Sequence, residues 1–392
     1  MRGELAHRGV ASASNKLARA RMIGGMEDSP RVKSYHRAHR VLAVTGFLLD
    51  LSVLLVFLFT GWTITLRAWS EHISGRPAIA LLIYLLVLGS ITWTLGLPLD
   101  FIEGFWLEHR FGLSNLSLLG WLQDHLKGIA VGGTLGALGL EFLYWTMRRW
   151  PERWWIISAG AFVGFFILLV NLAPVLFLPI FFKFKPLENP SLAQRLMDLA
   201  HRAGTNVKGV FEWKLSEKTK KANAALVGLG NTRRIILSDT LLEKFREDEI
   251  EAVLAHEFGH HVHRHITQGI ALRVAATFLG FYLVNLVLLR LDRFFRFRGL
   301  ADFANLPLLI LVGTTLSLML LPAVNARSRA MERQADAYAL RAVPSKAAFV
   351  ASMEKLAELN LAERYPHPWI ESIFHSHPSI EKRIAFAEKF QP

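Results

Sequence analysis

The sequence of 392 residues contains no cysteine. Disulfide bridges are therefore excluded, and so is any metal site built from thiolate ligands. Acidic residues are also in short supply, because 32 Asp and Glu stand against 45 Lys and Arg, which leaves a formal net charge of +13. Residues 1–40 lack the apolar core of a cleaved signal peptide. Their Arg- and Ser-rich start fits a transit peptide or a disordered basic tail, and we expect the tail. No internal repeat and no low-complexity tract is present.

Apolar residues, in contrast, are abundant, at 52% of the chain. They gather in runs long enough to cross a bilayer, which takes roughly 20 residues. The alternative is a large helical core in a soluble protein, but Arg, Lys and Trp flank the runs, as is typical of membrane helices. The sequence therefore predicts six transmembrane helices: Val41–Leu66, Pro77–Leu97, Gly128–Met147, Trp155–Phe182, Ile270–Leu289 and Leu306–Val324.

The excess positive charge lies at the ends of these runs. The segment "RVKSYHR" precedes the first run, and "MRRWPERWW" joins the third to the fourth. Anionic lipid headgroups are a simpler partner for such clusters than nucleic acid. We expect a monomer in contact with membrane lipid and no nucleic-acid partner.

The runs divide the chain into five portions. Residues 1–40 form the basic tail, 41–182 hold spans one to four, and 269–324 hold spans five and six. Between them, residues 183–268 read as a soluble α+β portion, with an amphipathic helix at "SLAQRLMDLAHRAG", short strands at "VKGVFEWKL", "NAALVGL" and "RRIILS", and a helix at "EDEIEAVLAHEFGHHVHRH". Residues 325–392 read as a second, mostly helical soluble portion.

The last helix of the α+β portion carries the chemistry. His256 and His260 are four residues apart and share one helix face. Two imidazoles in this arrangement bind one zinc ion, and Glu257 between them can act as general base for a water molecule. His261, His263 and His265 belong to the same cluster, but we expect them to point elsewhere and to be surface or interface residues.

A catalytic zinc needs a third protein ligand and an open position. The extended motif H-E-x-x-H-x-x-G-x-x-H fails, because His263 and Ile266 stand where it requires Gly and His. The alternative is Glu332 on the later helix "NARSRAMERQADAYA", with Asp336 one turn further on to accept a hydrogen bond from a ligand imidazole. Two predicted spans separate His260 from Glu332, so the chain returns to the same side of the membrane and the ligands can meet.

These motifs together resemble one family. The chain is similar over roughly Ser29–Phe390 to the type I CAAX prenyl endopeptidases, integral-membrane zinc metalloproteases of the gluzincin group. The resemblance rests on "HEFGH", "SRAMERQADAYA", "SHPSIEKRI", "ANAALVG", "RRIILSDTLL" and "LEHRFGLSN", in the order of the family. It implies a mainly α polytopic membrane protein whose helices surround an intramembrane chamber, with a small α+β gluzincin-type protease portion. Family members usually have seven spans, where six are counted here, and no C-terminal ER-retrieval signal is seen.

The resemblance also implies roles for single residues. His256, His260 and Glu332 would hold one zinc, with Glu257 as the base. Asn223 would hold the substrate backbone, and His377 rather than His375 would steady the tetrahedral intermediate. Arg383 would pair with Glu332 or Asp336, and the zinc side would face the cytoplasm.

The sequence thus predicts a membrane-embedded zinc metalloendopeptidase. By resemblance it removes the C-terminal aaX from prenylated CaaX proteins. One alternative is a quality-control protease for misfolded or non-prenylated proteins. Another is a non-catalytic receptor or transporter with a vestigial metal site, which the presence of Glu257 disfavours. A site-2-type intramembrane protease is rejected because "HEFGH" precedes a span instead of lying inside one.

Overall fold

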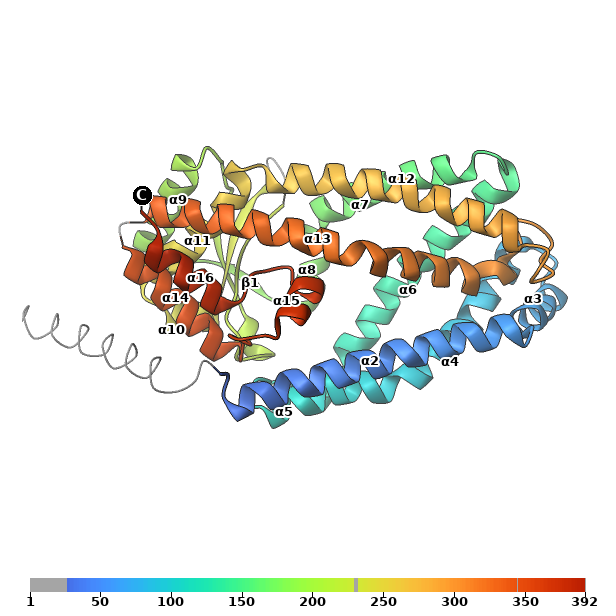
Figure 1. The fold of residues 1–392 in the computed structure, drawn as a ribbon, viewed down its shortest axis with the longest axis horizontal. Coiled ribbons are helices and arrows are strands. Elements are labelled where there is room, and N and C mark those ends of the chain that lie inside the picture. Colours follow the sequence, from blue (N-terminus) through green and yellow to red (C-terminus); the bar gives the residue numbers. More distant parts are fainter. Residues whose placement is uncertain (1–26, 229–231, 344, 392) are drawn as a thin grey trace, which may run out of the picture.

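The computed structural model describes residues 27–228, 232–343 and 345–391. Long helices run along the molecule, and a smaller mixed portion that contains all the strands sits at one end of them (Figure 1). The C-terminus lies at this end. The basic tail predicted for residues 1–40 falls largely outside the described residues.

Six helices of the described chain are long and apolar enough to cross a membrane, which agrees with the predicted number. The spans are α2 (Pro30–Phe59), α4 (Pro77–Phe101) with its continuation to Arg110, α6 (Leu118–Arg149), α7 (Trp154–Leu172) with its continuation to Phe181, α12 (His265–Leu291) and α13 (Leu306–Ala342).

These helices pack as a closed ring. Helix α2 contacts α4, α4 contacts α6, α6 contacts α7, α7 contacts α12, α12 contacts α13, and α13 returns to α2. Every span thus has two neighbours in the ring. The chamber inside it stays a prediction.

Several helices extend beyond their apolar runs. Helix α2 begins at Pro30, where the Ser29 hydroxyl accepts a hydrogen bond from the Val32 amide, so its first turns are the polar segment before the expected span. It ends at Phe59, because Gly61 adopts a left-handed φ of 75° and starts the short helix α3 (Trp62–Ile73). The predicted first span, Val41–Leu66, is therefore divided between two helices.

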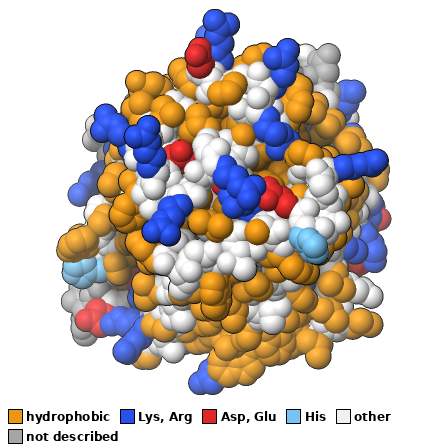
Figure 2. Space-filling model, turned by 90° about the vertical axis from the view of Figure 1, so that its right-hand side faces the viewer, with side chains coloured by type: hydrophobic (Ala, Val, Ile, Leu, Met, Phe, Trp, Pro, Cys, Tyr) orange, Lys and Arg blue, Asp and Glu red, His pale blue; other side chains and the backbone are white. Residues whose placement is uncertain are grey.

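The end of the ring that is remote from the strands carries Lys and Arg side chains on a largely apolar surface (Figure 2). Two ion pairs join its elements: Arg67 of α3 pairs with the buried Asp302, and Arg298 bonds Glu71 at 2.9 Å. Cationic helix ends of this kind are typical of segments that meet lipid headgroups.

The mixed portion is built on a four-stranded sheet of order β1-β2-β4-β3. Strand β4 (Arg234–Ser238) pairs parallel with β2 (Val210–Trp213) and antiparallel with β3 (Ala224–Val227). The three predicted strands are confirmed, whereas β1 (Phe184–Pro186) was not predicted. Strand β3 lies at the edge of the sheet and contacts α11 (Glu247–Val262).

Helices complete the mixed portion. They are α9 (Pro190–Arg202), α10 (Asp239–Lys244), α11, the distal half of α13, α14 (Lys346–Leu359), α15 (Pro368–Phe374) and α16 (Ile380–Lys389). Their apolar faces form one core with the sheet, in which Leu196, Leu237, Leu254, Phe258 and Phe349 are fully buried. Helix α13 belongs to both parts of the protein, because it runs from the ring into this core without a break.

Candidate metal centre

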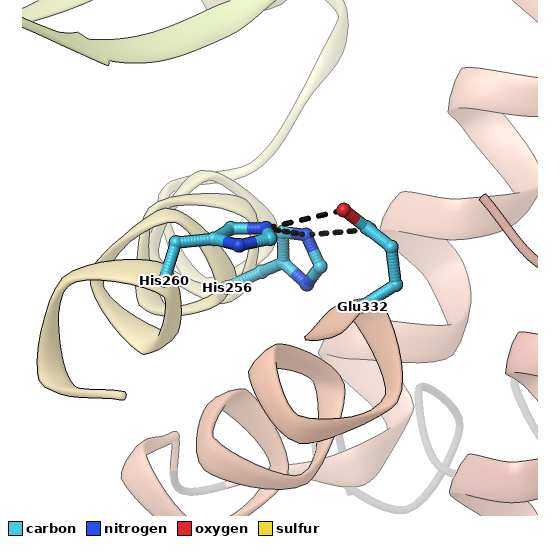
Figure 3. A group of neighbouring side chains, drawn as sticks. All are labelled: His256, His260 and Glu332. Atoms are coloured by element: carbon cyan, nitrogen blue, oxygen red, sulfur yellow. Dashed lines mark hydrogen bonds and ion pairs between the residues drawn. The ribbon is translucent and has the colours of Figure 1, made fainter. Parts of the chain in front are cut away.

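Helix α11 is fixed at its start by its own acidic residues. The Glu249 carboxylate accepts a hydrogen bond from the Arg246 amide at 2.8 Å, and two further acids lie in the first turn. Negative charge there complements the helix dipole. The apolar residues that follow are buried in the core, which leaves His256 and His260 on the face toward α13 (Figure 3).

Three side chains converge between α11 and α13. The Nε2 atoms of His256 and His260 are 3.2 Å apart, and the Glu332 carboxylate lies 3.2 Å from the first and 3.3 Å from the second. Four ligands at zinc–ligand distances of about 2.0–2.2 Å in a tetrahedron lie roughly 3.3 Å from one another. The three separations fit that geometry, and Glu332 Oε2 is buried without a hydrogen bond to any described residue. This donor set suits a metal ion.

A close helix contact brings the two helices together. Gly259, one residue before His260, packs on Ala335, and a Cβ atom added to Gly259 would lie only 2.8 Å from the Ala335 Cα. Only glycine permits this approach, since real Cβ atoms essentially never come so near another carbon. The glycine of "HEFGH" therefore sets the distance between the paired histidines and Glu332.

Asp336 and Arg383 support one ligand. The Asp336 carboxylate lies 2.8 Å from Nδ1 of His256, and Arg383 bonds both carboxylate oxygens of Asp336, at 2.9 and 2.6 Å. Burial and Arg383 act to lower the pKa of His256, but the contact with Asp336 and the nearby Glu332 carboxylate outweigh them and raise the pKa to about 9. When the ring is neutral, a proton on Nδ1 directed at Asp336 leaves Nε2 free to bind a metal ion. Of the two partners expected for Arg383, the structure pairs it with Asp336.

His265 contacts the other histidine of the pair, His260, and this contact was not predicted from the sequence. Its side chain is buried, with Nδ1 3.0 Å from Nδ1 of His260 and Nε2 2.8 Å from the Gln334 side-chain oxygen. The expectation that His265 is a surface or interface residue is therefore wrong. Arg264, with a left-handed φ of 55°, lies between the end of α11 and the start of α12 and redirects the chain, so that His265 turns back toward His260. An arginine does not announce a left-handed backbone conformation, so the sequence offered no signal that His265 would face His260.

Glu257 is the remaining polar residue of the motif. No described residue donates a hydrogen bond to its carboxylate. Burial raises the pKa of Glu257, and the charges of His256 and His260 partly offset that increase. A carboxylate with a raised pKa and no partner is a suitable general base, since the ideal pKa for this role lies near the working pH.

The loop between α15 and α16 brings His377 to the same place. His377 Nε2 lies 3.3 Å from Glu332 Oε1, and its side chain is 60% exposed. Its Nδ1 is 2.8 Å from the Ser376 hydroxyl. Partial desolvation by the surrounding protein lowers the pKa of the His377 imidazole although the side chain is largely exposed, and the Glu332 charge opposes this. For His375 the structure shows a backbone contact instead: its carbonyl accepts a hydrogen bond from Arg329.

A cavity of about 810 Å³ adjoins these residues. His377, Arg383 and Asn223 contribute to its walls. Asn223 directly precedes the edge strand β3, and its backbone is held on both sides by Ser238, at 2.9 Å each. Its side chain is exposed and has no hydrogen-bond partner among the described residues. The cavity thus extends from His377 and Arg383, which contact Glu332 and Asp336, to Asn223 at the start of an edge strand to which an extended peptide can pair.

Fold and site together define a membrane-embedded metallopeptidase. Residues 186–391 match the sequence model of peptidase family M48, and residues 26–183 match that of the CAAX prenyl protease N-terminal region of five membrane helices. The chain therefore belongs to peptidase family M48, in its CAAX prenyl protease group, and it is a metalloendopeptidase. The family and the class of enzyme that the motifs predicted are therefore confirmed.

Known relatives align over nearly the whole chain. An uncharacterized metalloprotease of Bacillus subtilis, YhfN, is 31% identical over 91% of this chain and 84% of its own. CAAX prenyl protease 1 of Saccharomyces cerevisiae is 28% identical over 90% of this chain and 84% of its own. The crystal structure of S. mikatae Ste24p matches with a TM-score of 0.82 and 26% identity, over 92% of this chain and 88% of that one.

Proposed function

We propose that this enzyme is a zinc endopeptidase that removes the C-terminal aaX tripeptide from prenylated CaaX proteins. His256, His260 and Glu332 hold the ion, and their mutual distances of 3.2 to 3.3 Å are the observation that carries the metal site. The similarity to CAAX prenyl protease 1 of Saccharomyces cerevisiae supports the substrate class. When bound, zinc supplies a Lewis acid that polarises the scissile carbonyl and lowers the pKa of water toward roughly 7.

The side chains around the ion perform the proton transfers. Glu257 takes a proton from the attacking water and passes it to the leaving amine, a role that its unpartnered carboxylate and raised pKa support. His377 donates a hydrogen bond to the oxygen on which negative charge develops. Asn223 binds the substrate backbone beside the edge strand β3.

We further propose the setting in which this happens. The metal centre faces the cytoplasm, one chain acts alone, and lipid surrounds the ring of spans. The substrate reaches the cavity beside Asn223 as an extended C-terminal peptide.

Two peptides of the same sequence test the substrate class, one farnesylated on the CaaX cysteine and one plain. We expect the purified enzyme to release aaX from the farnesylated peptide at a higher kcat/KM, and a chelator to stop the reaction. Equal cleavage of the two peptides would instead favour the quality-control protease. Absence of cleavage from a zinc-loaded enzyme would contradict the proposal as a whole.

The metal ligands have their own test. His256→Ala, His260→Ala and Glu332→Ala should each lower the zinc content sharply, whereas His261→Ala and His263→Ala should retain one zinc per chain. His265→Ala should fall between them, because loss of a residue that orients a ligand typically costs about 10–100-fold in metal affinity. Full occupancy in His256→Ala would mean that other imidazoles bind the ion.

A further inference from the structure

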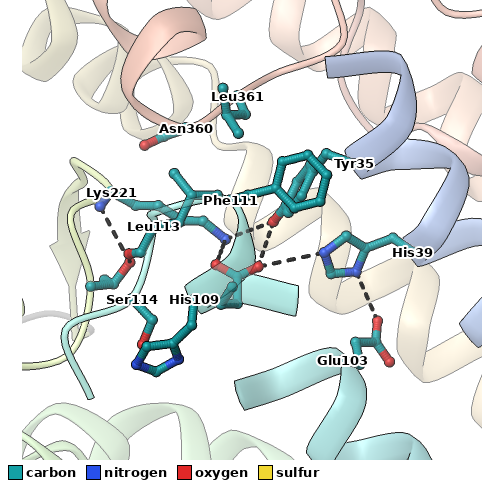
Figure 4. Close-up of polar contacts among 12 residues, drawn as sticks. Tyr35, His39, Glu103, His109, Phe111, Leu113, Ser114, Lys221, Asn360 and Leu361 are labelled. Carbon is teal, nitrogen blue, oxygen red and sulfur yellow. Dashed lines mark hydrogen bonds and ion pairs between the residues drawn. The ribbon is translucent and has the colours of Figure 1, made fainter. Parts of the chain in front are cut away.

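A polar cluster lies where the membrane helices meet the mixed portion (Figure 4). At its middle is Glu108, at the end of the second span. Its carboxylate accepts a hydrogen bond from the Tyr35 hydroxyl at 2.5 Å and pairs with the Lys221 ammonium at 2.8 Å. The Glu108 side chain is 14% exposed and that of Lys221 33%, so the pair is only partly open to solvent.

Other groups hold this carboxylate in place. His39 Nε2 lies 3.5 Å from Glu108, and the opposite nitrogen of the same ring is 3.0 Å from Glu103. Lys221 Nζ also donates to the Tyr35 hydroxyl at 3.0 Å. Tyr35 itself is buried, with its ring 5.1 Å from that of Phe111. The cluster therefore ties the first two spans to Lys221, which belongs to the mixed portion.

Backbone hydrogen bonds reinforce the same junction. The loop after Glu108 runs antiparallel to residues 218–220. Lys220 N donates to Leu113 O at 2.8 Å, and Asn115 N donates to Lys218 O at 2.9 Å. An isolated bridge between Ser114 and Thr219 lies between these bonds. Residues 113–115, in the loop after the second span, and residues 218–220 therefore form a short antiparallel hydrogen-bond ladder.

Lys221 stands two residues before Asn223. The intervening Ala222 is clamped by Asn360, whose side-chain oxygen accepts from the Ala222 amide at 2.9 Å and whose nitrogen donates to the Ala222 carbonyl at 3.2 Å. Asn223 is then bound to Ser238 through its backbone. A rigid path of three residues thus leads from the Glu108 ion pair to the exposed Asn223 side chain in the cavity wall.

Helix α2 also contacts other residues of the cavity wall. His36 Nε2 lies 2.7 Å from the Leu361 carbonyl, and Arg40 makes two hydrogen bonds, of 3.1 and 3.0 Å, to the Glu363 carboxylate. His36 and Glu363 line the same cavity as Asn223. The first turns of α2 therefore contact Lys221 and Glu363, both of which line the cleft that receives the peptide in the proposed function.

We propose that Glu108 is a positioning residue for the protease reaction: through Lys221 it fixes Asn223 against the substrate backbone. This inference rests on the proposed function, because it assigns Asn223 to substrate binding. Glu108 itself does not touch the metal ligands. Its effect is to keep the chain from Lys221 to Asn223 in one conformation, which lowers the ordering cost when an extended peptide binds.

Glu108→Gln is the variant that separates this role from a general one. The amide is of similar size and can still accept from Tyr35, but it removes the charge that holds Lys221, whose flexible side chain can then turn to solvent. We expect KM for the farnesylated peptide to rise about tenfold, the factor that corresponds to 1.4 kcal/mol of lost binding. The value of kcat should change by less than about twofold, since the metal centre is untouched, and zinc content should stay at one per chain.

A double-mutant cycle tests whether Glu108 acts through Asn223. We expect Glu108→Gln to add little in the background of Asn223→Ala, because the residue that it positions is gone. Glu71→Gln is the matched control, since it removes an ion pair with Arg298 at the remote end of the ring. It should leave KM unchanged.

Hydrogen exchange gives a readout that needs no substrate. In Glu108→Gln the amides of residues 218–227 should exchange faster than in the wild type, while those of α11 should not change. Unchanged exchange and KM, additive effects in the cycle, or a joint fall of kcat and zinc content would each overturn the proposal. If the wild type cleaves neither peptide, the proposed function fails, and the exchange experiment alone decides whether Glu108 positions this segment.

Discussion

Gly259→Ala should separate the metal ligands without removing any of them. The added Cβ would lie 2.8 Å from Cα of Ala335 and 3.0 Å from its carbonyl oxygen, whereas ordinary contact begins at 3.4 Å. Both neighbours are backbone atoms, so α11 and α13 must move apart by about 0.6 Å or more. The two histidines lie on α11 and Glu332 lies on α13. The shift therefore lengthens the distances of 3.2 and 3.3 Å to Glu332 and leaves the 3.2 Å distance between the imidazoles as it is.

Such a shift exceeds what a metal site tolerates, since ligand distances are held within about ±0.2 Å. We expect zinc affinity to fall at least about tenfold, in the range seen when a ligand is misdirected. Stability should fall by about 1–3 kcal/mol, as for other overpacked contacts. Zinc retained at a series of chelator concentrations measures the first effect, and thermal unfolding in excess chelator measures the second.

Gly269→Ala is the control. Gly269 lies on α12 with no atom within 4 Å of its added Cβ, so alanine fits and favours the helix by about 1 kcal/mol. It should bind zinc as the wild type does. Wild-type zinc affinity in Gly259→Ala would refute the claim that this glycine sets the distance between the ligands.

Three further outcomes are expected. His377→Ala should lower kcat about 10²- to 10³-fold with zinc content unchanged, as for other oxyanion donors, and His375→Ala should cost little; equal kinetics of the two would show that the wrong histidine was chosen. Asn223→Ala should mainly raise KM, since a group that holds the substrate backbone contributes largely to ground-state binding, and a loss confined to kcat would contradict that role. Burial acts to raise the pKa of Glu371, but bonds from Lys382 and the Ser379 amide outweigh it, so the pKa is lowered from 4.5. The stabilisation is therefore complete above about pH 4.5 and is lost as pH falls through the lowered value, and Glu371→Gln should abolish this acid-side loss in an unfolding series against pH.

The convergence of His256, His260 and Glu332 could be predicted from the sequence because its geometry is local or topological. His256 and His260 share a face at a spacing of four. Glu332 is separated from them by two spans, which return the chain to the same side of the membrane. Helix α13 then carries Glu332 and Asp336 into the core without a break. The number of spans could be predicted from the length of the apolar runs, since a membrane helix has a required length.

Features that depend on one backbone angle or on distant pairing could not be predicted. His265 faces His260 only because Arg264 is left-handed. The expected first span is divided because Gly61 ends one helix and begins the next. Strand β1 has three residues and takes its conformation from pairing with β2. For His377 the local sequence carried no signal, and only the resemblance to the family pointed to it.

The ion pair of Glu108 and Lys221 is the clearest example of distant pairing. More than a hundred residues separate the two, and although Glu108 lies in the motif "LEHRFGLSN", nothing in that motif points to Lys221. Neither a spacing nor a motif connects them. Only the packing of α2 and the second span against the mixed portion brings them within 2.8 Å.

One measurement tests the central claim most directly. It is the rate of farnesylated-peptide hydrolysis by Glu257→Gln and by the wild type, each shown to carry one zinc per chain. Glutamine keeps the size of the side chain but cannot accept the proton of the attacking water, so we expect kcat to fall at least about 10²-fold, the typical contribution of a general base. Near wild-type turnover by zinc-loaded Glu257→Gln would contradict the account.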